Sequence, residues 1–555
     1  MYVCVFVCLR WLKEGFATYW ETFVGSSVQP SMKFEEQFAI EKIFQFMEFD
    51  SLSNSHPMTV DLASSQTVIY QLYDSISYYK ASAIIRMISK ILGASTFQQG
   101  LQKYLKAFRF NSTTRHDLWK YLSEATTNHS INIEQILEGW VLQTGYPILE
   151  INRTENQLIL NQKPFYLRST TISNQNLWWI PFKYIDKSTD QHEIVWFNSS
   201  SMILSMNTSD SDWILANPDY LAVYRTKYDA HNFKLIVNQL FTNHTLIPTT
   251  NRAALIDDIF ALSRAGLANI SDAYALINYL KNETELVPWT MALAAINQQE
   301  ILLGEHKSLT DIQQYFLELI LPIYEQIGWT PLDQSTDWLY ALLQPSILST
   351  VCRYGHQHCI ESARQFYQNW TRNPTDNSIP ADLRVSVYCT IIRAGSRSEF
   401  DFLWSHLQNQ TIASETLNLL EGLACTRDSS LILRFLDQHL ENPSIIRAQD
   451  LIASIGRLAR SPQANQIVWN WIRDNWPKLT QKWDQSGSSL RKLIDAVSSR
   501  FVTPRKRDEL KLFADSIDAK GTLRQQFQSS IETINANIQW NTNNIPTIID
   551  FLRTK

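Results

Sequence analysis

One carboxylate near the amino terminus stands among aromatic residues. Glu14 lies in the run Trp11–Glu21, which also contains Phe16, Tyr19 and Trp20. A carboxylate is costly to bury in apolar surroundings unless it is paired or binds a metal ion. The spacing alone favours an ordinary, partly exposed carboxylate on an amphipathic helix, with a metal ligand as the alternative.

Histidine and cysteine are the other side chains that commonly bind zinc. The chain has eleven histidines, and no two of them have the i, i+4 spacing that places two imidazoles on one helix face. His356 and His358 lie between Cys352 and Cys359, so these four residues are a candidate metal cluster. Adjacent His358 and Cys359 would have difficulty facing one tetrahedral ion, and an oxidising compartment would favour a disulfide instead.

Length and composition bound the class of protein. The chain has 555 residues, enough for roughly two to four domains. Hydrophobic residues make up 45% of it and aromatic residues 12%, which is ample for large cores. The net charge of −5 is mild, and there is no basic block, so we expect no nucleic-acid partner.

Sequons for N-linked glycosylation are frequent. One sequon is weak evidence, but ten together favour a secretory or ectodomain history. Their asparagines are Asn111, Asn128, Asn152, Asn198, Asn207, Asn243, Asn269, Asn282, Asn369 and Asn409. The apolar start, Met1–Leu9, is too short for a membrane-spanning helix and lacks the basic start and cleavage site of a signal peptide. The sequence therefore predicts that the parent protein is extracellular or a plasma-membrane ectodomain, and we expect no signal or transmembrane segment in this chain.

Hydrophobic periodicity divides the chain into three parts. Residues 10–143 have a helical pattern, interrupted by a polar turn at Asp50–Pro57. Short runs rich in aromatic and β-branched residues follow between 148 and 228, and they predict a small β-sandwich. Its expected strands include runs at 157–160, 177–185, 193–197, 213–216 and 221–224. From about residue 231 the pattern is helical again, without one dominant heptad, which predicts a superhelix of helical repeats.

Several of these segments resemble one enzyme family. Around Glu14, W-L-x-E-G-F-A-x-Y is similar to the third-ligand segment of the aminopeptidase N-like zinc aminopeptidases, the gluzincins of the membrane alanyl aminopeptidase family. Residues 74–88 resemble that family's D-x-I-x-Y-x-K-G-A-S-V-x-R-M-L helix, with Ala81 where the family usually has glycine. Residues 50–57 resemble its D-S-L-x-x-S-H-P segment.

The resemblance implies roles for individual residues. Glu14 would be a zinc ligand, and Tyr78 would hydrogen-bond the tetrahedral intermediate beside the zinc. A plain core tyrosine is the alternative for Tyr78. The cysteine spacings match the family's two disulfides, so the resemblance implies the pairs Cys352–Cys359 and Cys389–Cys425.

The resemblance also implies a fold and a function. We expect a mainly α protein with a β-sandwich insert: the helical remnant of a thermolysin-like catalytic domain (1–143), a β-sandwich (144–229) and an α-superhelical C-terminal domain (230–555). The expected function is zinc-dependent removal of amino-terminal residues from peptides, with peptides as partners and a possible homodimer through the helical domain.

Two family segments are missing from the 555 residues. Counting back from Glu14 at the family spacing places H-E-x-x-H before Met1, and G-x-M-E-N is also absent. One ligand does not make a catalytic zinc site, which ordinarily needs three. We therefore expect a truncated gene model, an internal start or a spliced isoform, inactive by itself. The alternatives are a secreted, non-catalytic pseudo-peptidase that binds peptides or partners, and a generic α-solenoid interaction protein. The matched segments argue against the last.

Overall fold

The structure is a computed structural model of the chain. It describes residues 10–53, 55–60, 74–126, 132–154, 156–167, 176–187, 193–206, 208–335, 337–441, 444–447, 450–483 and 488–554. The chain forms two compact units, one of Met1–Tyr279 with Val287–Ala295, the other of Leu280–Leu286 with Ile296–Lys555. The fold is mainly α-helical with a small β region, as the sequence predicts. None of the described helices is both long enough and apolar enough to cross a membrane.

The first unit begins with helices. Helix α1 packs against α5 and against η4, a short π-helical turn that leads directly into α5. The helices of this part are α1 (Arg10–Val28), α2 (Phe34–Phe38), η3 (Ala39–Ile43), α3 (Phe44–Phe49), η4 (Ile76–Lys80), α5 (Ala81–Leu92), α6 (Ala94–Ala107), α7 (Arg115–Ala125) and α8 (Ile133–Leu142). In α5 the residues Ala81–Ile88 are all buried, because this helix lies in the middle of the bundle.

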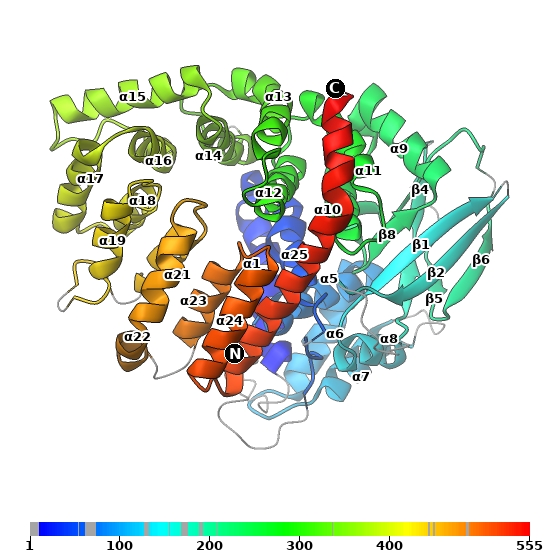
Figure 1. Cartoon of the computed structure of the whole chain (residues 1–555). Coiled ribbons are helices and arrows are strands. Elements are labelled where there is room, and N and C mark those ends of the chain that lie inside the picture. Colours follow the sequence, from blue (N-terminus) through cyan, green and yellow to red (C-terminus); the bar gives the residue numbers. More distant parts are fainter. Residues whose placement is uncertain are drawn as a thin grey trace. The chain divides into compact units, whose positions relative to one another are not determined.

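The β region follows α8 in the same unit. Its main sheet has the strand order β6-β2-β1-β8, with β1 and β2 joined as an antiparallel hairpin and β8 parallel to β1 (Figure 1). Two smaller ladders pair β3 with β5 and β4 with β7. The strands are β1 (Pro147–Thr154), β2 (Gln157–Pro164), β3 (Ile180–Phe182), β4 (Tyr184–Asp186), β5 (Val195–Phe197), β6 (Ser201–Ser205), β7 (Ile214–Ala216) and β8 (Arg225–Tyr228).

One expected strand is not formed. Leu221–Tyr224 is buried but has no ladder, and strand β8 begins only at Arg225. The side chain of Asn217 explains this, because it accepts from the N–H of Ala222 at 2.9 Å and donates to the Ala222 carbonyl at 2.8 Å. The backbone groups that a strand would pair are thus occupied by an amide side chain. The strand prediction for Leu221–Tyr224 was wrong for this reason.

Helices α9 (Ala230–Asn243), α10 (Thr249–Arg264) and α11 (Ile270–Ile277) complete the first unit, and α12 (Leu286–Leu303) contributes to both units. The second unit is a succession of helices. Helices α14, α16, α18, α20, α23 and α25 each contact the next, and α15 and α17 pack outside them (Figure 1). The unit consists of α13 (Leu309–Ile327), α14 (Trp338–Arg353), α15 (Gln357–Arg372), α16 (Arg384–Ala394), α17 (Arg397–Asn409), α18 (Ala413–Leu423), α19 (Ser429–Asp437), α20 (Leu451–Ala459), α21 (Asn465–Asp474), α22 (Trp476–Trp483), α23 (Ser488–Ser498), α24 (Pro504–Ser516) and α25 (Gly521–Arg553).

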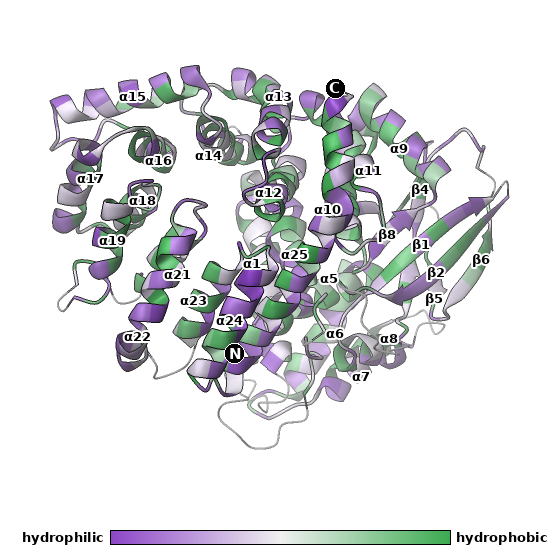
Figure 2. Ribbon diagram, in the orientation of Figure 1, coloured by the Kyte–Doolittle hydropathy of each residue, from purple (hydrophilic) through white to green (hydrophobic). Residues whose placement is uncertain are grey.

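Several helices of the second unit have two unlike sides. Figure 2 shows hydrophobic and hydrophilic residues on different sides of helices such as α21, α23 and α24. In α23 the buried residues Leu490, Leu493, Ile494 and Val497 recur at helical spacing. Stacked helix pairs bury such faces between neighbours, so this unit has the helical-repeat organisation that the sequence predicts.

Candidate functional site

Glu14 and Tyr78 meet in the structure. Glu14 is on α1 and Tyr78 is on η4, two elements that pack against each other, and the Glu14 carboxylate lies close enough to the Tyr78 hydroxyl to affect its ionisation. The Glu14 side chain is only 14% exposed, and the ammonium of Lys13 lies 3.4 Å from its carboxylate. Glu14 is therefore a partly buried helix carboxylate with an ammonium and a phenol as neighbours.

The surroundings of Tyr78 keep its hydroxyl protonated. Burial raises the pKa of Tyr78, and the negative charge and hydrogen bond of Glu14 raise it further, while Arg10 acts in the opposite direction. Arg10 lies one helical turn before Glu14, and burial lowers its own pKa although Tyr78 and Glu14 oppose this. At neutral pH Tyr78 is thus a neutral phenol and can donate a hydrogen bond.

A close helix contact brings the two residues together. A Cβ atom built on Gly15 would lie 2.5 Å from the Cβ of Ala81 and 3.2 Å from its backbone carbonyl carbon. Only glycine lets α1 approach the beginning of α5 so closely. Hydrogen bonds fix the register of α1, from Trp11 Nε1 to Thr59 Oγ1 and between the hydroxyls of Tyr19 and Ser89, both at 2.9 Å.

The amino-terminal end of the Tyr78 turn is held by an aspartate and a histidine. Asp74 Oδ1 accepts the backbone N–H groups of Ile76 and Ser77 at 3.0 and 3.1 Å. Its other oxygen lies 2.6 Å from Nε2 of His56, whose Nδ1 lies 2.8 Å from the carbonyl of Pro57. Both ring nitrogens face acceptors, so His56 satisfies both contacts only as an imidazolium. Burial alone would lower the pKa of His56, but the bond to Asp74 and its charge produce a net rise.

The other end of the turn is held by a buried ion pair. Lys80 Nζ lies 2.8 Å from Asp50 Oδ2 and 2.8 Å from the carbonyl of Gly145, and both charged side chains are 0% exposed. Asp50 Oδ1 accepts from Ser55 Oγ at 2.5 Å and from the Gly145 N–H at 3.1 Å. A buried pair persists when its remaining hydrogen-bonding capacity is satisfied, as it is here.

The sequence did not predict this clamp, which consists of the pairs His56–Asp74 and Asp50–Lys80 at the two ends of the Tyr78 turn. The sequence pattern indicates a polar turn for the segment that contains Asp50 and His56, whereas these two residues hold the two ends of the turn that carries Tyr78. A signal was present, because Asp74 and Lys80 flank Tyr78 at positions −4 and +2 in the second matched segment. The partners of these charges, Asp50 and His56, lie in the matched segment at residues 50–57.

The donor set for a metal ion is incomplete. Within the described ranges, no three His, Cys, Asp or Glu side chains form a group that could hold a metal ion. Glu14 already has a phenol and an ammonium as neighbours, and the chain has no histidine before His56. These residues do not fit a catalytic zinc site, which needs three protein ligands.

Comparison with known proteins identifies the family. The model of the ERAP1-like C-terminal domain matches residues 213–536, which is more than half of the chain. The model of the peptidase family M1 domain matches residues 8–140. The chain belongs to the M1 zinc aminopeptidase family. The M1 match includes both Glu14 and Tyr78.

Curated relatives match almost the whole chain. The chain is 32% identical to the thyrotropin-releasing hormone-degrading ectoenzymes of Rattus norvegicus and Homo sapiens over 553 residues, 96% of the chain and 51% of each relative. It is 29% identical to aminopeptidase N of Mus musculus over 552 residues, 96% of the chain and 56% of that relative. The chain thus spans about half the length of the curated M1 relatives that it matches.

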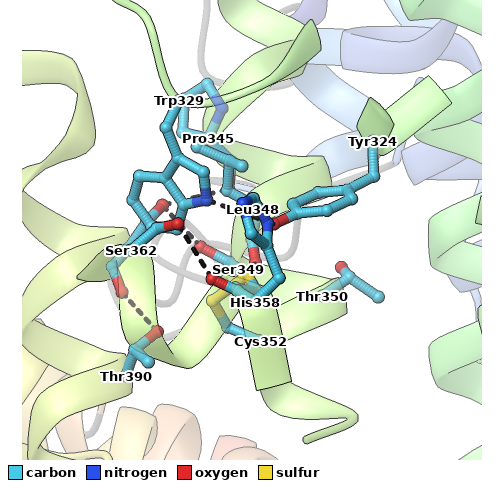
Figure 3. The surroundings of a disulfide bond; sticks show 12 residues. Tyr324, Trp329, Pro345, Leu348, Ser349, Thr350, Cys352, His358, Ser362 and Thr390 are labelled. Atoms are coloured by element: carbon cyan, nitrogen blue, oxygen red, sulfur yellow. Dashed lines mark hydrogen bonds between the residues drawn. A yellow bond between two sulfur atoms is a disulfide. The ribbon is translucent and has the colours of Figure 1, made fainter. Parts of the chain in front are cut away.

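Both disulfides implied by the resemblance are formed. Cys352–Cys359 joins α14 to α15, and Cys389–Cys425 joins α16 to the segment after α18. Figure 3 shows His358 beside Tyr324, whose hydroxyl lies 2.7 Å from Nδ1 of His358. The alternative metal cluster is excluded, because both of its thiols are joined to each other and His358 is bound to Tyr324.

The sequons are placed where an oligosaccharide could be attached. Eight of the ten asparagines lie in the described residues, and all eight are exposed: Asn111, Asn152, Asn198, Asn243, Asn269, Asn282, Asn369 and Asn409. Asn128 and Asn207 lie outside the described residues. Exposure is required for modification, so all eight remain candidate sites.

Proposed function

We propose that this chain supplies one zinc ligand, Glu14, and one oxyanion donor, Tyr78, to an extracellular zinc aminopeptidase that removes amino-terminal residues from peptides. The observation that carries the proposal is the proximity of these two side chains, which lie 64 positions apart in sequence. Tyr78 lies on a turn that is held at both ends. A solvent-exposed carboxylate and an isolated core tyrosine would not require such an arrangement.

Tyr78 has the properties of an oxyanion donor. Its raised pKa keeps the hydroxyl protonated at neutral pH, and the clamp on η4 fixes its direction before substrate binds. A preorganised donor of this kind contributes roughly 3–4 kcal/mol to transition-state stabilisation.

By itself the chain would not hydrolyse peptides. Zinc in this family activates water and polarises the scissile carbonyl, and Glu14 is a single ligand without the two histidines and the general base of H-E-x-x-H. Activity therefore belongs to a polypeptide that contains that segment as well. If no such polypeptide exists, the second candidate function is a secreted, non-catalytic pseudo-peptidase, which the incomplete donor set favours.

The extracellular location rests on three observations. The exposed sequons and the two disulfides suit an oxidising secretory route. Related proteins are named as ectoenzymes. Peptide ligands and a homodimer through the helical unit complete the proposal as its expected partners.

Zinc content and turnover test the proposal on the purified chain. We expect substoichiometric zinc by atomic emission and no hydrolysis of alanyl or leucyl chromogenic amides. Stoichiometric zinc, with turnover abolished by Glu14→Gln but retained in Glu21→Gln on the same helix, would refute the predicted inactivity. The transcript upstream of Met1 separates the two candidates: an in-frame H-E-x-x-H ending eighteen residues before Glu14 supports the enzyme, and its absence supports the pseudo-peptidase.

A further inference from the structure

Strand β6 is an edge strand of the main sheet. It pairs with β2 on one side, and no described strand pairs with its other side. Edge strands present unpaired backbone groups to other chains, and natural proteins protect them with lysine, proline, bulges or a covering segment. Ile203, in the middle of β6, is 60% exposed.

The usual protective residues are absent from this part of the sequence. From Ile194 to Ser209 there is no Asp, Glu, Lys, Arg or Pro. The strand itself, Ser-Met-Ile-Leu-Ser, has three consecutive apolar residues. Short, uncharged segments of high β-propensity on an edge are aggregation sites unless something blocks them.

Sequons flank β6 in the sequence instead. Asn198 lies in the exposed turn between β5 and β6, and Asn207 follows β6 by two positions in sequence. The register places a third sequon on the same surface, because Asn152 of β1 pairs with Ile159 of β2, and Ile159 pairs with Ile203. Directly paired residues point to the same face of a sheet, so these three side chains form one row about 10 Å long.

We propose that N-linked glycans on Asn152 and Asn198 cover the exposed Ile203, the partly exposed Ile159 beside it and the edge of β6, and so replace the charged residues that protect other sheet edges. The apolar faces of the first sugars would pack over the two isoleucines. The bulk of the oligosaccharides would exclude a second strand from the edge, since such modifications are large and solubilising. The proposal rests on the secretory route proposed above.

The chemistry is that of ordinary N-glycosylation. The amide nitrogen of each asparagine loses a proton and forms a bond to C1 of the first sugar, while the bond from that carbon to the phosphate of a lipid pyrophosphate donor breaks. Both acceptor sequences are accessible: Asn152 and Thr154 are exposed on β1, and Asn198 and Ser200 are exposed in the turn. The sequon hydroxyls can therefore be removed without changing the asparagines.

The test begins with occupancy. The full chain is secreted from an animal-cell host behind a heterologous signal peptide, and glycopeptide mass spectrometry measures the modified fraction at each sequon. We expect Asn152 and Asn198 to be modified in most molecules. Their vacancy in secreted protein would overturn the proposal and would leave the roles of Glu14 and Tyr78 untouched.

Aggregation then tests the role of the glycans. The double variant Thr154→Ala with Ser200→Ala should lose both glycans and form soluble aggregates at least several-fold faster in light scattering than wild type. The matched control Thr411→Ala removes the sequon of Asn409, at the end of α17, and should behave as wild type. Asn152→Gln checks that Thr154→Ala acts through the glycan, because it leaves the hydroxyl in place.

The decisive variant adds Ile203→Lys to the double variant. A lysine in the middle of β6 should restore the solubility of the double variant, because it supplies the missing edge charge. Aggregation that persists with Ile203→Lys, or a double variant as soluble as wild type, would overturn the proposal. So would a discrete dimer of fully glycosylated wild type that Ile203→Lys dissociates, since the edge would then be an interface between two copies of the chain.

Discussion

Replacing Gly15 with alanine should loosen the contact that brings α1 to α5. The new Cβ would lie 2.5 Å from the Cβ of Ala81, whereas ordinary contacts begin at 3.4 Å, so the helices must separate by roughly 1 Å. Insertion of a methyl group into a packed contact costs about 1–3 kcal/mol. Helix propensity alone would favour alanine over glycine by about 1 kcal/mol, so a net destabilisation would show that the close approach dominates.

A double-mutant cycle with Ala81 isolates the contact. Ala81→Gly alone should cost about 1 kcal/mol, because glycine weakens a helix. In the double variant the nearest clash is gone. Its loss of stability should therefore be at least about 1 kcal/mol smaller than the sum of the losses in the two single variants. Recovery will be partial, since the backbone carbon of Ala81 and Cδ1 of Ile85 remain at 3.2 Å.

Hydrogen exchange with mass spectrometry is the suitable assay, because two compact units need not unfold together. Peptides from α1 and α5 report the local opening free energy, and peptides from α16 and α23 provide the internal reference. If Gly15→Ala leaves α1 as protected as wild type, or if the two changes add within about 0.5 kcal/mol, the reasoning about this contact is wrong.

Three further changes test the clamp and the second unit. Lys80→Met should lower the local opening free energy, as measured by hydrogen exchange, by about 3–5 kcal/mol, because it leaves Asp50 buried without its partner. The double variant Lys80→Met with Asp50→Leu should lower this free energy clearly less, because both charges are removed. The pKa of His56 is raised in the folded state, so the stability that protonated His56 gives the folded state should be complete below its unfolded pKa near 6.5. This stability should disappear as pH rises through the folded pKa. Asp74→Asn should flatten this pH dependence, as measured by hydrogen exchange in η4 peptides. Burial lowers the pKa of His439 to about 4, so protection of α19 and α20 should be full above pH ~6.5 and should fall as pH decreases toward 4; unchanged protection at pH 5 would contradict the buried, neutral imidazole.

The proximity of Glu14 and Tyr78 could be anticipated from the sequence, but the two charged pairs that hold the Tyr78 turn could not. Residue types and motif resemblance selected the two residues, because their segments are local and continuous. The clamp joins Asp50 to Lys80 and His56 to Asp74, and nothing in the periodicity of either segment states which charge meets which. Such pairings are set by tertiary packing, which a single sequence does not display.

The β region shows the same limit at the level of secondary structure. Alternation and composition placed strands at 157–160 and 213–216, where β2 and β7 lie. They also placed a strand at Leu221–Tyr224, where the side chain of Asn217 takes the backbone partners. A side chain that bonds the backbone five residues away overrides local propensity, and only the three-dimensional arrangement shows it.

The parallel pairing of β1 with β8 has a consequence for synthesis of the chain. Ile148 pairs with Arg225, and all other strands of the region lie between them in sequence. During translation β1 and β2 can form their hairpin early, but the second edge of β1 stays open until β8 has left the ribosome. The sheet therefore passes through a period with free edges on both sides, and a sugar already attached at Asn152 would be in place before the last strand arrives.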